Sequence, residues 1–93
     1  MNIRWAPAAA DDLEEIGAYL KEHEAALAES TVRNLYDTVQ SLRQFPRRGR
    51  LGKKSETREL LTTPLPYLII YEIQGDTIHI LRIAHGARNW PTR

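Results

Sequence analysis

The chain has 93 residues, a length that fits one domain with a small core. It contains no cysteine, which excludes disulfides and thiolate metal sites, and its longest apolar run, residues 67–71, is too short to cross a bilayer. No signal-peptide pattern opens the sequence, so we expect one cytoplasmic domain over residues 1–93, without a membrane partner.

The first third of the chain predicts a short strand followed by a helix. Residues 2–6 form the strand, and Pro7 suits the first turn of a helix. Asp11 and Asp12 follow, and carboxylates near a helix start interact favourably with the helix dipole. Apolar residues then recur at spacings of three and four, which predicts an amphipathic helix over about residues 8–23. Its apolar stripe is Leu13, Ile16 and Leu20.

A second helix is expected over about residues 25–45. Pro46 ends it, because proline cannot continue a helix. Its apolar residues alternate at spacings of four and three, which gives a narrow seam suited to packing along another helix. The two helices therefore read as an antiparallel hairpin. The seam consists of Ala28, Val32, Leu35, Val39 and Leu42.

The second half of the chain predicts a loop and then strands. Residues 47–54 hold two glycines and five cations, which is typical of a loop. Strands are expected over 57–61, 67–73 and 77–85, the last two joined by a Gly-Asp turn. The order β-α-α-β-β-β predicts an α+β domain in which an antiparallel sheet packs against the helical hairpin.

Charge is unevenly distributed along the chain. Residues 1–30 carry two cationic and seven acidic side chains, whereas residues 31–60 carry eight cationic and three acidic ones. This polarity suits an acidic partner, protein or nucleic acid, facing the middle of the chain. The alternative is a solvated loop that keeps the molecule soluble. The densest cluster is Arg43, Arg47, Arg48, Arg50, Lys53, Lys54 and Arg58.

Two polar residues of the last strand are candidate functional groups. Regular alternation places Arg82 on one face with Ile80 and Ala84. Arg82 is either a clamp for a phosphate or carboxylate, or an outward arginine whose stem covers apolar surface. His85 is either a general base or a strand-end histidine bonded to the backbone. No spacing around the histidines indicates a metal site.

Tyrosines of the central strand are expected in the core. Tyr67 and Tyr71 share one face with Ile69 and Ile73, so packing beneath the helices is favoured over base stacking. The adjacent pair Arg58-Glu59 is interpreted as an ion pair or a turn anchor.

The segment after the last strand combines a cation and an aromatic ring. Arg88 and Trp90 bracket Asn89, and arginine with an aromatic residue is typical of binding hot spots. The alternative is a tail folded back on the sheet, with Trp90 closing the edge of the core.

Short motifs follow one another in a definite order over nearly the whole chain. Together they resemble the ParE/RelE superfamily of bacterial toxins from type II toxin–antitoxin modules. The matching residues are Trp5-Ala6-Pro7, Asp12-Leu13 with Ile16 and Tyr19, Pro46, Gly49-Arg50, Arg58-Glu59-Leu60, residues 66–71 and residues 80–91.

The superfamily divides by target, and the resemblance is fuller to ParE. RelE-like members cut mRNA on the ribosome, whereas ParE-like members poison DNA gyrase. RelE-like members commonly place an arginine just before the central strand, where this chain has Pro66-Tyr67. They also often end in a tyrosine, where this chain has residues 89–93 without one. Arg88 does match an arginine that some nuclease members carry after the last strand.

The ParE resemblance implies a toxin that blocks gyrase by binding and is held inactive by a cognate antitoxin, ParD-like or similar. No catalysis, cofactor, metal or sequence-specific DNA binding is then expected. The antitoxin tail is expected to lie across the helical hairpin and reach the sheet. The residues expected to contact the target are Arg88, Asn89 and Trp90; those expected to contact the antitoxin are Arg43, Arg47, Arg48, Arg50 and Arg58.

Two alternatives remain open from the sequence. One is a RelE-like ribosome-dependent mRNA endonuclease, in which Arg82, His85 and Arg88 supply the acid, base and cationic groups that cleavage through the 2′-hydroxyl requires. The other is a non-toxic partner-binding module that has kept the same fold.

Overall fold

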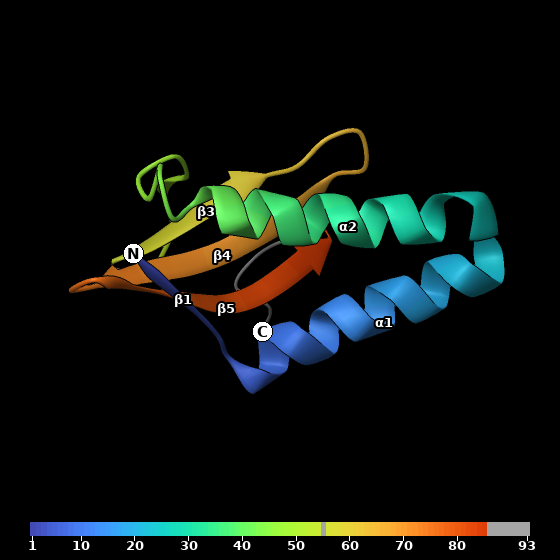
Figure 1. Cartoon of the computed structure of the whole chain (residues 1–93), viewed down its shortest axis with the longest axis horizontal. Coiled ribbons are helices and arrows are strands. Elements are labelled where there is room, and N and C mark those ends of the chain that lie inside the picture. Colours follow the sequence, from blue (N-terminus) through green and yellow to red (C-terminus); the bar gives the residue numbers. More distant parts are fainter. Residues whose placement is uncertain (55, 86–93) are drawn as a thin grey trace.

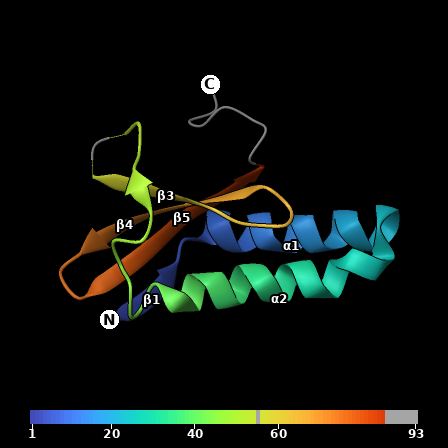
Figure 2. The same cartoon turned by 90° about the horizontal axis from the view of Figure 1, so that it is seen from above.

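Two helices cover one face of a five-stranded sheet in the computed structural model, which describes residues 1–54 and 56–85 (Figures 1 and 2). The two helices run side by side as a hairpin that packs against the sheet. This is the expected α+β architecture. In chain order the elements are β1 (Asn2–Trp5), α1 (Pro7–His23), α2 (Ala25–Ser41), β2 (Arg50–Leu51), β3 (Thr57–Leu61), β4 (Tyr67–Gln74) and β5 (Thr77–His85).

The sheet is mixed, with strand order β1-β5-β4-β3-β2. The predicted antiparallel pairing of the last three strands is confirmed. The sheet is not antiparallel throughout, because β1 pairs in parallel with β5, from Asn2 opposite Thr77 to Trp5 opposite Ile80. Side-chain alternation predicts a strand but carries no information on the direction of its neighbour. A short strand, β2, also forms inside the predicted loop and pairs with β3.

The helix boundaries agree with the sequence at three of four ends. α2 stops at Ser41, earlier than the expected residue 45. The residues after it form tighter bonds: the Leu42 N–H donates to the carbonyl of Val39 at 3.0 Å, and the Arg43 N–H to that of Gln40 at 3.1 Å. Such bonds to the third preceding residue are the usual way in which a helix end satisfies its carbonyls. The turn thus begins before Pro46 is reached.

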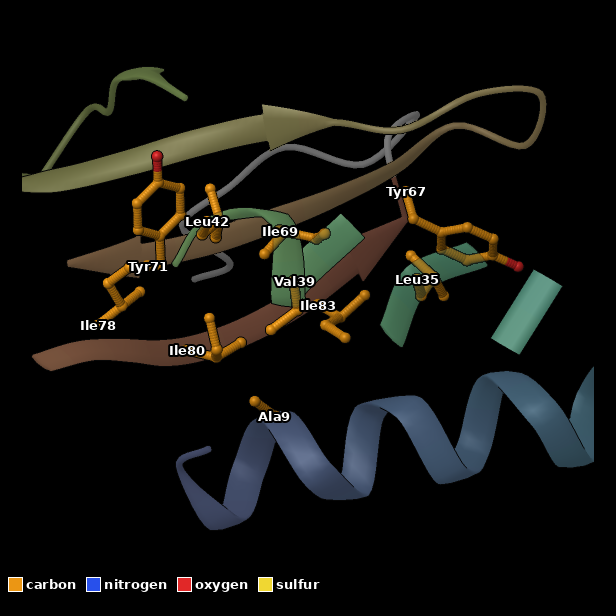
Figure 3. Packing of buried hydrophobic residues seen from close by; sticks show 10 residues of the cluster. All are labelled: Ala9, Leu35, Val39, Leu42, Tyr67, Ile69, Tyr71, Ile78, Ile80 and Ile83. Atoms are coloured by element: carbon orange, nitrogen blue, oxygen red, sulfur yellow. The ribbon is translucent and has the colours of Figure 1, made fainter. Parts of the chain in front are cut away.

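The core lies between the sheet and the helical hairpin (Figure 3). Tyr67, Ile69 and Tyr71 of β4 are buried in it and Ile73 packs against it, which confirms the expected role of this strand face. Leu13 and Ile16 of the α1 stripe also pack against this core, and Leu20 is buried. The predicted seam of α2 divides, however. Leu35, Val39 and Leu42 enter the core, whereas Ala28 and Val32 lie beside α1.

A β-bulge in β5 changes which side chains face the core. Ile70 is opposite Arg82 but Tyr71 is opposite Ile80, so Leu81 is the extra residue. Ile80 and Ile83 consequently both enter the core, although they are three positions apart. The prediction that Arg82 shares a face with Ile80 is therefore wrong, because one inserted residue reverses the alternation beyond it.

Tyr71 connects the core to the turn that follows α2. Its hydroxyl donates to the carbonyl of Pro46 at 2.7 Å and accepts from the N–H of Gly49 at 2.8 Å. A Cβ atom at Gly49 would lie 2.8 Å from the Tyr71 ring, so only glycine allows this approach. Burial raises the pKa of Tyr71, and the hydrogen bond from Gly49 opposes this only in part.

We expect Tyr71→Phe to lower the free energy of unfolding by about 1–3 kcal/mol, because it leaves the buried Gly49 N–H without its acceptor. Tyr36→Phe is the matched control, since Tyr36 is half exposed, and should change stability by less than about 0.5 kcal/mol. Urea unfolding followed by circular dichroism measures both. Equal stability of the two variants would contradict the role assigned to the hydroxyl.

The raised pKa of Tyr71 also predicts a loss of stability in alkali. Its contribution is complete below the ordinary tyrosine value of about 10 and is lost as the pH rises through the higher folded-state value. The wild type should therefore lose stability in strong alkali more steeply than Tyr71→Phe. If the free energy of unfolding of the two proteins fell equally with rising pH, the role assigned to Tyr71 in alkali would be contradicted.

Candidate functional site

Asp12 of α1 holds the open edge of β5. Its carboxylate accepts from Arg82 Nε at 2.7 Å, from Arg82 Nη2 at 2.9 Å and from the Ile83 N–H at 2.9 Å. The register of β1 reaches only Ile80, so Asp12 takes the place of a strand partner where β1 has turned into the helix. The interpretation of Asp12 as a helix-dipole residue is wrong, since it lies beyond the first turn of α1.

Arg82 is thereby committed to a carboxylate of its own chain. The side chain of Asp12 is 10% exposed and that of Arg82 is 42% exposed, so the pair is shielded on one side only. The hydrogen bond to Asp12 raises the pKa of Arg82 further above its usual range. The sequence offered either a clamp for a ligand or an outward arginine over apolar surface; the structure instead pairs Arg82 with a carboxylate of its own chain.

His85 lies on the opposite face of β5 from Arg82. Paired residues share a face, and His85 is opposite Tyr67 whereas Arg82 is opposite Ile70. The His85 ring meets the edge of the Tyr67 ring, with centroids 5.6 Å apart. The register therefore directs Arg82 and His85, two of the three candidate nuclease groups, to opposite faces of β5. The third, Arg88, lies outside the described residues, as do Asn89 and Trp90.

Arg58 and Glu59 anchor the basic loop from opposite sides of β3. Arg58 donates to the carbonyls of Gly49 at 2.8 Å and Arg47 at 3.4 Å. The Glu59 carboxylate, 3% exposed, pairs with Arg50 at 3.2 Å and accepts from the Lys53 N–H at 3.5 Å. Of the two sequence interpretations, the turn anchor is confirmed; as adjacent strand residues, Arg58 and Glu59 point to opposite faces.

The five arginines expected to meet an antitoxin thus have different local roles. Arg50 and Arg58 bind the loop to β3. Arg43 donates to the Met1 carbonyl at 3.2 Å and to the Gln40 side chain at 3.4 Å, and so ties the end of α2 to the start of the chain. Arg48 donates to the Ser41 hydroxyl at 2.8 Å. Arg47 contributes its carbonyl to Arg58, while its side chain is exposed.

The outer surface of the helical hairpin carries a groove that the sequence did not predict. Two adjoining hollows of about 800 and 610 Å³ lie between α1 and α2. Small residues make this possible, since a Cβ at Gly17 would come within 3.2 Å of Val32. In the sequence, the first two residues of the α2 seam, Ala28 and Val32, could have indicated this groove. Residues common to both hollows are Leu13, Gly17, Lys21, Val32 and Tyr36.

Within residues 1–54 and 56–85, His, Cys, Asp and Glu side chains form no group of three that could hold a metal ion. Over the same part of the chain, none of the helices has the length and apolar character needed to cross a bilayer.

The fold and the sequence now define a class of protein. The chain resembles a structure described as a chromosomal ParDE toxin–antitoxin system from P. aeruginosa, with a TM-score of 0.85, 26% identity and coverage of 91% of this chain and 95% of the other. A model of the ParE toxin family, from the type II toxin–antitoxin system parDE, matches residues 3–90. The chain therefore belongs to the ParE toxin family.

Two relatives named as toxins support the assignment. Y4kP of Sinorhizobium fredii is 37% identical over 90 residues, which cover 97% of this chain and 93% of the relative. Toxin RelE2 of Caulobacter vibrioides is 36% identical over 87 residues, which cover 94% of this chain and 97% of the relative. The sequence-based identification of a type II toxin of the ParE/RelE superfamily is confirmed, and the ParDE structure supports an antitoxin as its partner.

We expect Asp12→Ala to lower the free energy of unfolding by about 2–3 kcal/mol, because it removes charge-assisted bonds to Arg82 and leaves the Ile83 N–H unpaired. Asp11→Ala is the matched control, as the neighbouring carboxylate is exposed, and should stay within about 0.5 kcal/mol of wild type. Asp12→Asn should fall between them, since an amide oxygen still accepts from the Ile83 N–H. Chemical denaturation measures all three, and equal effects of Asp11→Ala and Asp12→Ala would refute the clamp.

Proposed function

We propose that this chain arrests growth in the cytoplasm by binding DNA gyrase, and that a ParD-like antitoxin neutralises it. Membership of the ParE family is the observation that carries the proposal. The mechanism is inhibitory binding. The residues proposed to contact gyrase are Arg88, Asn89 and Trp90, as the resemblance implies.

The arrangement of β5 favours binding over RNA cleavage. General acid–base catalysis requires its groups to converge on one reacting centre. Here Asp12 holds the Arg82 guanidinium at the edge of β5, while His85 contacts Tyr67 on the face that the helices cover. A guanidinium already bound to an internal carboxylate is also less available to a phosphate. These contacts support the gyrase-binding proposal over the nuclease alternative.

The groove on the helical hairpin is the proposed docking site for an amphipathic segment of the antitoxin. Amphipathic helices commonly place their apolar faces in such grooves. The floor offers Leu13 and Val32, and Tyr36 stands at its side with 49% exposure. Charged residues of both signs, such as Lys21, Glu29 and Arg33, line the groove and can fix the direction of the bound segment.

Target identity can be tested by comparing two activities of the purified protein. We expect it to inhibit gyrase supercoiling and to leave ribosome-bound mRNA intact, and expression alone should arrest growth. Arg88→Ala should reduce both gyrase inhibition and arrest, and removal of residues 89–93 should abolish them. Cleavage of mRNA in the ribosomal A site that disappears in Arg88→Ala would establish the nuclease instead. Normal growth at verified levels of soluble protein would favour the non-toxic module.

The groove can be tested independently of the target. Tyr36→Ala should weaken antitoxin binding by about tenfold or more, because an aromatic side chain at the edge of an apolar site is a typical hot spot. Growth arrest by the variant alone should persist. Tyr19→Ala is the matched control, since Tyr19 is 61% exposed and stacks on His23 outside the groove. Titration calorimetry with the antitoxin encoded beside the toxin gives the affinities, and equal losses in both variants would place the antitoxin elsewhere.

A further inference from the structure

The turn after α2 presents an exposed aromatic ring beside two arginines. Phe45 is 61% exposed, so its apolar ring is accessible to a partner. It borders a hollow of about 630 Å³ on the protein surface. We call this hollow the Phe45 notch; it is lined by Ser41, Phe45, Pro46, Arg47 and Arg48.

The notch is preorganised by side chains from the core and from β3. Tyr71 binds the carbonyl of Pro46 at 2.7 Å, and Arg58 binds the carbonyl of Arg47 at 3.4 Å. Arg48 is itself held by the Ser41 hydroxyl at 2.8 Å. A loop whose backbone is fixed in this way loses little conformational freedom when a partner binds. These contacts argue against a merely solvated loop.

The electrostatics of the notch select an acidic partner. Arg50 is paired with the buried carboxylate of Glu59, so its charge is largely offset within the chain. Arg48 donates to the Ser41 hydroxyl, a neutral partner that does not offset its charge. Arg47 is also exposed and lines the same hollow. Two arginines beside an apolar ring complement a segment that has carboxylates on either side of an apolar side chain.

We propose that the Phe45 notch docks an acidic segment of the antitoxin, with one apolar side chain over Phe45 and flanking carboxylates on Arg47 and Arg48. This rests on the proposed function, and the antitoxin is chosen because the ParDE similarity supports that class of partner. Only part of the basic cluster then contacts the antitoxin directly. Arg50 and Arg58 act through the shape of the loop, whereas Arg47 and Arg48 contact the partner.

A pair of labelled peptides tests the chemistry of the notch. One has a single leucine flanked on both sides by glutamates, and the other has serine in place of leucine. Fluorescence anisotropy should show the leucine peptide binding the wild type about tenfold more tightly, the difference that burial of one apolar side chain commonly produces. Phe45→Ser should remove this preference, and Phe45→Leu should restore part of it. Equal affinities of the two peptides for wild type, or no binding, would overturn the proposal.

The role of charge is tested with variants that remove the same charge at different places. Arg47→Ala should weaken both peptides severalfold and reduce the dependence of association on salt. Arg4→Ala is the matched control, because Arg4 alternates with the core-packed Ile3 and Trp5 and so points to the sheet face away from the helices; it should leave both affinities unchanged. A similar loss in Arg4→Ala would mean that the peptides sense only net charge, which contradicts a specific site.

The source of the segment is tested in cells and with nucleic acid. Phe45→Ser should still arrest growth but should need severalfold more co-expressed antitoxin for rescue. Loss of arrest with unchanged antitoxin affinity would assign the notch to the target and overturn the proposal. Binding of a labelled oligothymidine that depends on Phe45 and exceeds peptide binding would do the same. If wild type fails to arrest growth, the proposed function fails, while the peptide affinities still report on the notch.

Discussion

The arrangement of helices and sheet depends on the contacts that the Asp12 carboxylate makes with β5. This carboxylate joins α1 to β5 across 70 residues of sequence and satisfies both the Arg82 guanidinium and the Ile83 N–H. Its position follows from the parallel pairing of β1, which ends at Ile80 and leaves the rest of β5 without that neighbour. An acidic side chain at this point closes a sheet edge that would otherwise expose unpaired backbone groups. The hairpin is thereby fixed relative to the sheet.

Tyr71 and Glu59 fix the basic loop, residues 47–54, to the sheet, as Asp12 fixes α1 to β5. Each is a buried polar group from the sheet that takes its partners from residues of the loop. Cations that the sequence presents as one cluster are consequently divided between internal and external roles. Arg58 stabilises the loop by donating to the carbonyl of Gly49, whereas Arg47 lies on the surface of the loop. A count of positive charges therefore overstates how many arginines a partner can contact.

The same contacts shape the functional conclusion. A nuclease must gather acid, base and cationic groups at one point, and β5 instead distributes Arg82 and His85 over two faces. Surfaces suited to a protein partner lie elsewhere, in the groove of the helical hairpin and at the Phe45 notch. Both surfaces involve α2, one along the helix and one at its end. A single helix thus presents an apolar surface and a cationic one to the outside while its inner face completes the core.

The sequence by itself determined the order of the elements apart from the short strand β2, the core face of β4 and the family, because apolar periodicity and short motifs are local properties that survive in the fold. It also indicated the turn anchor at Arg58-Glu59, although not the partners of either residue. The tertiary structure decided the parallel pairing of β1, the bulge at Leu81 and the bond between Asp12 and Arg82. These features depend on which distant segments become neighbours. A single extra residue in a strand reverses every side chain beyond it, and periodicity read along one strand cannot show such a change.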